Sequence, residues 1–295
     1  MQTHSFGLYG IALLAACLLF SSCNQAPKFE DHPQLTAGVV MRDVTFFSPS
    51  MGRNMPYRVI LPRTITPGAK LPAVYVLHGG GGDYRQWSNA SDIARYAERQ
   101  IVLVMPDAGY SYYTNSVAHP ADRYEDYVVK DLVRDVETRF PVAGDRPHRA
   151  VIGISMGGFG AVKMALRHPD LFAFAGGLSS AIDVPSRPFS LRHFGQWREY
   201  RTIFGPWNGD FQHQNDPFVL ARNANVSQVP YLYLSCGTQD PLLAPNRQFA
   251  SLLSARSFAF EFHQVPGGHD FSRWNADLPG LFASLEQHLA KPAAP

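Results

Sequence analysis

The chain has 295 residues, of which 45% are hydrophobic and 17% are charged. This balance excludes a disordered or coiled-coil protein and predicts a sizeable buried core. The formal net charge is only +2 and no Lys- or Arg-rich run occurs, so the composition gives no indication of nucleic-acid binding.

The N-terminal segment is predicted to be an export signal. Residues 6–20 carry no charged side chain, over a length too short to span a bilayer comfortably but typical of the apolar part of a signal peptide. The following Ser21-Ser22-Cys23 resembles a bacterial lipoprotein signal, in which Cys23 becomes the lipidated first residue of the mature chain. An ordinary secretory signal cleaved nearby is the alternative. We therefore predict a signal peptide over 1–22, a polar tether over 23–37 and an exported protein, periplasmic or in the cell envelope, that meets a membrane only through a lipid anchor.

The remaining chain, residues 38–290, is predicted to be one α/β domain. Apolar runs with few interruptions are typical of buried parallel strands. We expect strands over 39–48, 57–61, 73–77, 101–105, 150–154, 172–178, 231–235 and 258–264. Helical periodicity predicts helices over 92–100, 126–140, 161–167 and 246–255, with a last helix near the C-terminus. Alternating strands and helices imply a mostly parallel sheet flanked by helices.

Two parts of this domain depart from the alternating pattern. Residues 181–227 are rich in Pro, Arg and aromatic side chains and are predicted to be an irregular, cap-like insertion over a site. Cys236 is the single cysteine of the mature domain, so no internal disulfide can form there, and no metal-ligand spacing occurs. The apolar segment YLYLS that directly precedes Cys236 predicts that this cysteine is buried in a strand and is not a reactive thiol.

The strongest local motif is Gly153-Ile154-Ser155-Met156-Gly157, between a predicted strand and a helical stretch. A nucleophilic serine must project from a sharp turn between strand and helix, where neighbouring side chains would collide. The flanking glycines remove those side chains and let the backbone adopt the strained turn. Ser155 is therefore the candidate nucleophile.

Two downstream segments supply the partners that such a serine needs, a base and a carboxylate that orients it. Asp240 lies in the loop after the strand ending at 235, and His269 in the loop after the next strand. The order Ser155, Asp240, His269 is that of the α/β-hydrolase fold. His119 and His263 are alternative bases, and Asp183, Asp210, Asp216 and Asp270 are alternative acids, with less favourable positions in the chain.

The glycine run after the strand 73–77, Leu77-His78-Gly79-Gly80-Gly81-Gly82, is the candidate oxyanion loop. Acyl transfer places negative charge on a carbonyl oxygen, and two preorganised N–H groups must stabilise it. We predict that these are the backbone N–H groups of Gly80 and Met156, with Gly79 as the alternative to Gly80. The run is not a P-loop, because no Lys-Ser or Lys-Thr pair follows it. It is not a dinucleotide-binding loop either, because it lacks a suitably placed acidic partner.

Residues 38–290 resemble the esterase D and feruloyl-esterase-like branch of the α/β-hydrolases. The segments LHGGGGD at 77–83, GISMGGFGA at 153–161, GTQDPLLAPNRQF at 237–249 and PGGHDFSRW at 266–274 carry the resemblance. That group also includes tributyrin esterases, S-formylglutathione hydrolases and antigen-85 mycolyltransferases. The resemblance implies the same triad and oxyanion donors, and a reaction through an acyl-serine with no metal or organic cofactor.

The substrate expected from this reading is a small-molecule or carbohydrate ester with a short acyl or feruloyl-type group. Acyl transfer to an alcohol acceptor is the alternative activity, and a non-catalytic binding module is a third interpretation. Aromatic side chains near the predicted catalytic loops and in the insertion are candidates for the pocket wall. They are Tyr112, Tyr113, Trp197, Trp207 and Trp274.

Overall fold

The computed structural model describes residues 30–292. The predicted signal peptide, its lipidation site Cys23 and the first part of the predicted tether lie outside these residues. Within them, no helix is both long and apolar enough to cross a membrane.

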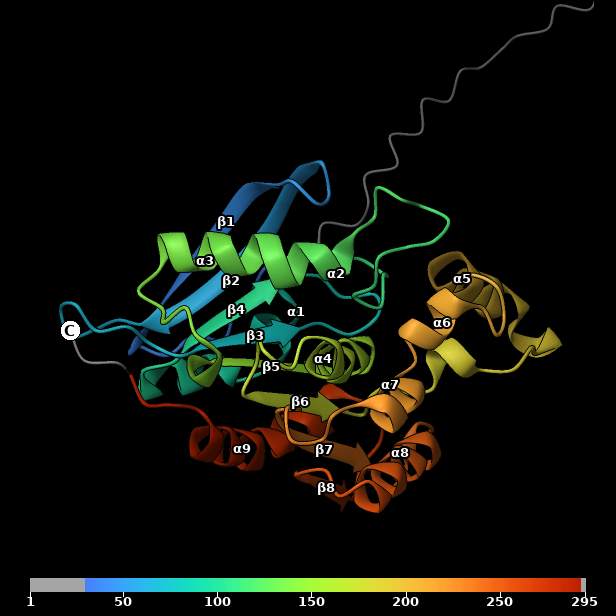
Figure 1. Ribbon diagram of the computed structural model, residues 1–295. Coiled ribbons are helices and arrows are strands. Elements are labelled where there is room, and N and C mark those ends of the chain that lie inside the picture. The colour runs from blue at the N-terminus through green and yellow to red at the C-terminus, as the bar shows by residue number, and fades with distance from the viewer. Residues whose placement is uncertain (1–29, 293–295) are drawn as a thin grey trace, which may run out of the picture. The chain divides into compact units, whose positions relative to one another are not determined.

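A mixed eight-stranded sheet forms the centre of the described part of the chain, in the order β1-β2-β4-β3-β5-β6-β7-β8. Its strands are β1 (Val39–Ser48), β2 (Arg53–Pro62), β3 (Ala73–Leu77), β4 (Val102–Pro106), β5 (Arg149–Ile154), β6 (Phe174–Leu178), β7 (Tyr231–Gly237) and β8 (Phe260–Val265). β1 and β2 pair antiparallel, as do β2 and β4, and every later pair is parallel. The parallel strands therefore end at one common edge, which agrees with the predicted fold class (Figure 1).

Helices cover both faces of this sheet because alternate strand residues point to opposite sides. On one face lie α2 (Tyr124–Asp126), η2 (Tyr127–Leu132), α3 (Val133–Arg139), α4 (Met156–Arg167) and α8 (Leu243–Ala255). On the other lie α1 (Gln86–Ala90), η1 (Ile93–Arg99) and α9 (Phe271–His288). The alternation is visible in β3, where Tyr75 packs with the first group and Val74 and Val76 with the second.

The predicted helices differ in detail from the observed ones. The segment predicted as a helix over 92–100 forms a 3-10 helix, and the one predicted over 126–140 contains the π-helical turn η2. The helix predicted to start at 161 begins at Met156. Its first turns contain glycines, which weaken the helical signal in the sequence, but the sharp turn after β5 imposes helical geometry there.

The insertion over 181–227 is largely helical, so the prediction of an irregular segment was wrong. It contains η4 (Val184–Ser186), η5 (Leu191–His193), α5 (Phe194–Phe204), α6 (Asp210–Gln214) and α7 (Pro217–Asn223). The start of α7 has a local cause, because Asp216 accepts a hydrogen bond from the Phe218 N–H at 2.8 Å and Pro217 occupies the first helical position. The insertion follows β6, and Figure 1 shows α5 and α6 beyond the carboxyl edge of the sheet.

Candidate active site

Ser155 stands at the turn between β5 and α4 in a conformation that non-glycine residues rarely adopt, with φ 51° and ψ −112°. The backbone is crowded around it. A Cβ atom on Gly157 would lie 2.3 Å from the Leu77 carbonyl oxygen, and one on Gly153 would lie 2.4 Å from the Gly157 carbonyl carbon. Both glycines of the motif are therefore required by the close approach of the backbone, and the turn projects Ser155 at the carboxyl edge of the sheet.

The structure brings Ser155, His269 and Asp240 into one chain of contacts. His269 Nε2 lies 3.0 Å from Ser155 Oγ, and its Nδ1 lies 2.8 Å from Asp240 Oδ2. An ionised carboxylate can only accept hydrogen bonds, so Nδ1 carries the proton in this pair. Nε2 of the neutral ring is then free to accept a proton from the Ser155 hydroxyl.

Asp240 is held in its ionised form although its side chain is fully buried. Burial alone would raise the pKa of this carboxyl, but hydrogen bonds from His269, Ser179 and the backbone outweigh it and lower the pKa below its usual value. The backbone donor is the Leu242 N–H, 2.8 Å from Oδ1. Asp240 can therefore stabilise a positive charge that forms on His269.

Trp274 and Ser179 support this carboxylate and the imidazole. The Trp274 indole N–H donates to Ser179 Oγ at 3.1 Å, and the indole meets the His269 ring edge to face at 5.1 Å. Trp274 is only 6% exposed, so it packs behind the imidazole, and we correct the prediction that it lines a substrate pocket. The sequence showed no motif at Ser179, which follows β6 with a positive φ of 47°.

The predicted oxyanion donors have no partner within residues 30–292. Neither the Gly80 nor the Met156 backbone N–H donates a hydrogen bond there, whereas the Gly79 N–H is bound to Gln86 Oε1 at 2.9 Å. Gly79 is thereby excluded as the alternative donor. Met156 opens α4, and the first N–H groups of a helix have no partner inside it.

His78, beside this loop, is a structural residue. Its Nε2 accepts the Ala108 N–H at 3.0 Å, so Nδ1 must carry the proton that is shared with the Gly79 carbonyl oxygen at 2.8 Å. Burial lowers the pKa of His78, which keeps the ring neutral. Through these two bonds His78 joins the glycine run after β3 to the loop after β4.

Tyr112 and Tyr113, predicted to line a pocket, are instead buried, at 4% and 0% exposure. The Tyr113 hydroxyl donates to the His78 carbonyl oxygen at 3.1 Å, and the Tyr112 ring packs against Phe159. Their neighbour Tyr110 is 38% exposed. The consecutive positive φ values of 52° and 50° turn the two side chains inward, which no local sequence pattern indicated.

The tryptophans of the insertion lie at or near its surface. Trp207 is 42% exposed and Trp197 is half-buried. The Arg201 guanidinium lies over both rings, 5.9 Å from the centre of Trp197 and 5.4 Å from that of Trp207. No contact joins either tryptophan to Ser155 or His269 in the described part of the chain.

None of the alternative bases and acids named from the sequence makes a side-chain contact with Ser155 or His269 within the described residues. His263 lies on β8 and pairs with Glu261 at 2.7 Å. Asp183 pairs with Arg187, and Asp216 and Asp270 cap α7 and α9. The remaining alternative base, His119, and the alternative acid Asp210 make no contact with Ser155 or His269 within the described residues.

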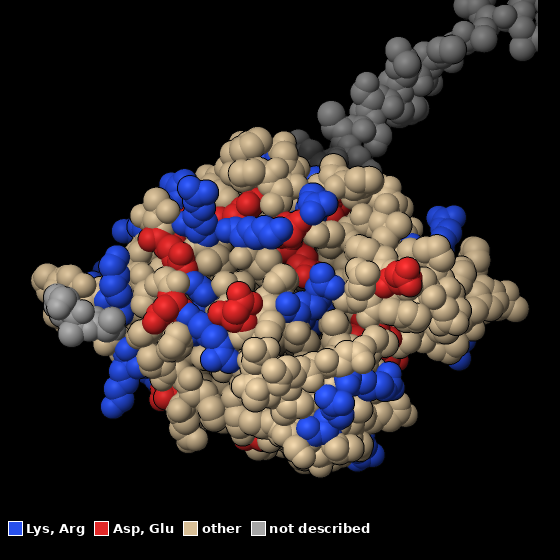
Figure 2. Space-filling view, in the orientation of Figure 1, with Lys and Arg blue, Asp and Glu red and all other residues tan. Residues whose placement is uncertain are grey.

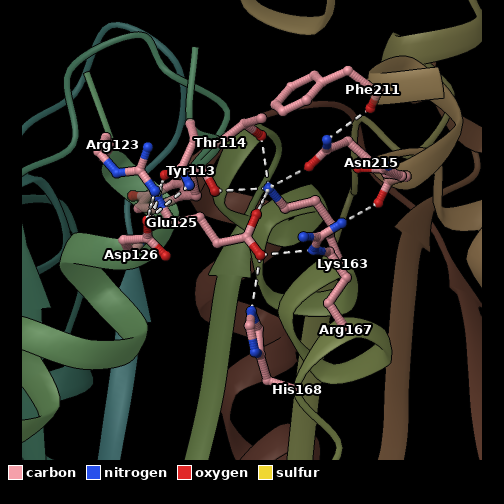
Figure 3. A network of polar contacts seen from close by, with 12 residues as sticks. Tyr113, Thr114, Arg123, Glu125, Asp126, Lys163, Arg167, His168, Phe211 and Asn215 are labelled. Carbon is pink, nitrogen blue, oxygen red and sulfur yellow. Dashed lines mark hydrogen bonds and ion pairs between the residues drawn. The ribbon is translucent and has the colours of Figure 1, made fainter. Parts of the chain in front are cut away.

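A buried polar network joins α4, the helix that follows Ser155, to its surroundings (Figure 3). Lys163 of α4 is fully buried, and its Nζ donates to the Tyr113 carbonyl oxygen at 2.8 Å, Thr114 Oγ1 at 2.7 Å and Glu125 Oε2 at 2.8 Å. Asn215, between α6 and α7, adds a fourth oxygen at 3.4 Å. Three segments that are distant in sequence thus meet at one ammonium group, which sequence reasoning missed because Lys163 resembles any polar residue of an amphipathic helix.

The described residues contain no cluster of three or more His, Cys, Asp and Glu side chains that could hold a metal ion. Cys236 is buried in β7, as predicted, and burial raises the pKa of its thiol to about 12. On the face shown in Figure 2, Asp and Glu lie among the Lys and Arg side chains over most of the surface, and only a small group of basic side chains gathers at the lower right.

The strand order, the turn at Ser155 and the helices on both faces define an α/β-hydrolase fold. Residues 48–285 match the family described as "Putative esterase", and the chain belongs to this family. An acetyl esterase from Caldicellulosiruptor saccharolyticus is 24% identical, over 83% of this chain and 97% of its own length. The diacylglycerol acyltransferase/mycolyltransferase Ag85A of Mycobacterium leprae is 25% identical, over 97% of this chain and 93% of its own. The fluorophosphonate-binding serine hydrolase F of Staphylococcus aureus superposes with a TM-score of 0.72 at 26% identity, covering 84% of this chain and 98% of its own.

Proposed function

We propose that this protein is an exported serine carboxylesterase with Ser155 as nucleophile, His269 as general base and Asp240 as orienting acid. The continuous contact from Ser155 through His269 to Asp240 is the observation that carries the proposal. This arrangement supplies an activated oxygen nucleophile, a ring in the correct tautomer and a buried negative charge behind it.

The proposed reaction proceeds in two halves. His269 takes the hydroxyl proton of Ser155 as Oγ attacks the ester carbonyl carbon, and the oxyanion accepts hydrogen bonds from the Gly80 and Met156 N–H groups. The alcohol leaves with the proton from His269, and an acyl-serine remains. Water that loses its proton to His269 then attacks the acyl carbonyl, which releases the acid and restores Ser155.

The proposed substrates are esters with a short acyl or feruloyl-type group, on simple alcohols or on carbohydrates. Similarity to an acetyl esterase over most of both chains supports the short acyl group. Acyl transfer to an alcohol acceptor is the second candidate, supported by the similarity to a mycolyltransferase over 97% of this chain. Both activities share the acyl-serine, so product analysis with an added sugar acceptor distinguishes them. A binding module without catalysis is disfavoured because the three side chains are all present and in contact.

The test uses the purified chain without its leader, residues 24–295, and p-nitrophenyl esters of graded acyl length. Ser155→Ala should retain the far-UV circular dichroism of the wild type and lose kcat/KM by several powers of ten. Ser251→Ala, on the exposed side of α8, is the matched control and should keep wild-type rates. A fluorophosphonate probe should label the wild type and the control but not Ser155→Ala. Labelling that persists in Ser155→Ala, or no turnover by the wild type, would overturn the proposal.

We also propose that the chain is a lipoprotein anchored through Cys23. The apolar segment 6–20 followed by Ser21-Ser22-Cys23 supports this location. A bacterial lipoprotein carries several acyl chains, which anchor a protein stably where a single chain does not. The full-length protein should fractionate with membranes, Cys23→Ser should remain unprocessed or be released, and Cys17→Ser should behave as the wild type. A mature N-terminus elsewhere without lipid, found by intact mass, would contradict the anchor.

A further inference from the structure

A cleft of about 220 Å³ lies between the loop after β4 and helix α5 of the insertion. Clefts that hold drug-sized ligands measure roughly 300–1,000 Å³, so this one has room for a single small unit. It is lined mostly by polar side chains beside tyrosine rings, among them Tyr110, Thr114, Ser116, His119, Glu199 and Thr202. Hydroxyl groups beside aromatic rings are complementary to a polyhydroxylated molecule.

Hydrogen bonds to the end of α5 hold the walls of this cleft in place. The N–H groups of Val117 and Ala118 donate to the carbonyl oxygens of Ile203 and Thr202, each at 3.1 Å, and Ser116 Oγ donates to the same Thr202 oxygen at 3.1 Å. Thr114, on the inner side, is held by the buried Lys163 ammonium (Figure 3). The cleft is therefore preformed, so the protein loses less conformational entropy when a ligand binds.

Two polar groups in the cleft have no hydrogen-bond or ion-pair partner among residues 30–292. They are the carboxylate of Glu199 and the imidazole of His119, both exposed to solvent. The His119 ring is free although its backbone N–H is bound to Ser116 Oγ. Glu199 is exposed at the rim of the cleft, and partial burial by the cleft wall raises the pKa of its carboxyl. A hydroxyl donor from a ligand would satisfy it.

The cleft adjoins the proposed oxyanion loop through one side chain, Tyr110. A Cβ atom on Gly80 would lie 2.7 Å from Tyr110 Cε2, so the ring presses against the backbone of the proposed oxyanion donor. The same ring lines the cleft and is 38% exposed. The cleft and the proposed oxyanion donor therefore share one wall residue, Tyr110.

We propose that this cleft binds the sugar or polyol portion of the ester alcohol, with Glu199 and His119 accepting or donating hydrogen bonds to its hydroxyl groups. The inference rests on the proposed esterase function and adds to it a site for the alcohol. The cleft would select the alcohol portion of the ester and not its acyl group. It would therefore favour carbohydrate esters over simple alkyl or aryl esters.

The test compares kcat/KM for methyl 6-O-acetylglucopyranoside with that for p-nitrophenyl acetate, which carries the same acyl group on an alcohol without hydroxyls. In Glu199→Gln the ratio of sugar ester to aryl ester should fall about tenfold, as expected for a lost hydrogen bond to a charged group. Asp170→Asn, an exposed carboxylate in the loop before β6 at the opposite edge of the sheet, is the matched control and should keep the wild-type ratio. An unchanged ratio in Glu199→Gln, or an equal loss on both esters, would overturn the sugar site.

A binding experiment separates failure of this site from failure of the proposed function. Methyl glucoside should give saturation-transfer NMR signals with the wild type and with Ser155→Ala, and weaker ones with Glu199→Gln. If the wild type hydrolyses neither ester, the proposed function fails and the NMR comparison still decides the site. Equal signals from wild type and Glu199→Gln would show that the cleft does not bind the sugar through this carboxylate.

Discussion

The buried Lys163 ammonium is predicted to be a major contributor to the stability of the site, and Lys163→Met tests this. Lys163 and Glu125 have side-chain exposures of 0% and 4%. Removing one partner of a buried ion pair costs about 3–5 kcal/mol, because the other charge stays buried. In Lys163→Met, Arg167 and His168 still contact Glu125 Oε1, at 2.7 and 2.8 Å. The expected loss of unfolding free energy is therefore at the lower end of that range, about 3 kcal/mol.

The measurement is urea unfolding followed by tryptophan fluorescence, with Lys130→Met as the matched control. Lys130 makes an ion pair of similar length, 2.7 Å to Asp126, but its side chain is 63% exposed. Such a helix surface pair contributes only about 0.3–0.5 kcal/mol. If Lys163→Met loses no more unfolding free energy than Lys130→Met, the reasoning from burial is refuted.

Three further outcomes are expected. Glu125 has a pKa held below its usual 4.5, because Lys163, His168 and Arg167 outweigh the effect of burial. The unfolded chain therefore binds this proton first, and the wild type should lose unfolding free energy more steeply than Glu125→Gln as the pH falls below about 4.5. Equal slopes below that pH would contradict this. Gly157→Ala should abolish soluble, active protein because its Cβ meets backbone at 2.3 Å, whereas Gly195→Ala, with nothing within 4 Å, should show a wild-type melting temperature and activity. Trp207→Ala should change the ratio of kcat/KM between acetyl and feruloyl esters by a factor equivalent to about 1–3 kcal/mol, without the loss of activity by several powers of ten expected for Ser155→Ala. An unchanged ratio would assign Trp207 to packing alone.

The sequence alone was sufficient to predict the sheet and the three candidate catalytic residues, for a physical reason. Short apolar runs such as 73–77 can be satisfied only by burial on both faces, so they identify parallel strands. The carboxyl ends of parallel strands lie at one edge, and any residue directly after such a strand is brought to that edge. Ser155, Asp240 and His269 each follow a strand in this way, so chain order was enough to bring them together.

The tertiary structure decided what depends on contacts between distant segments. Lys163 finds Glu125 38 residues away and Tyr113 50 residues away, and no periodicity within α4 distinguishes it from a surface lysine. The burial of Tyr112 and Tyr113 depends on two consecutive positive φ values, which neighbouring residues alone do not impose. The cleft against α5 depends on hydrogen bonds from the loop after β4 to Thr202 and Ile203, a pairing across more than 80 residues. The preference of a segment for helix or strand depends on residues close to it in sequence. Burial and polar pairing depend on residues that are close in space, and only the tertiary structure brings these together.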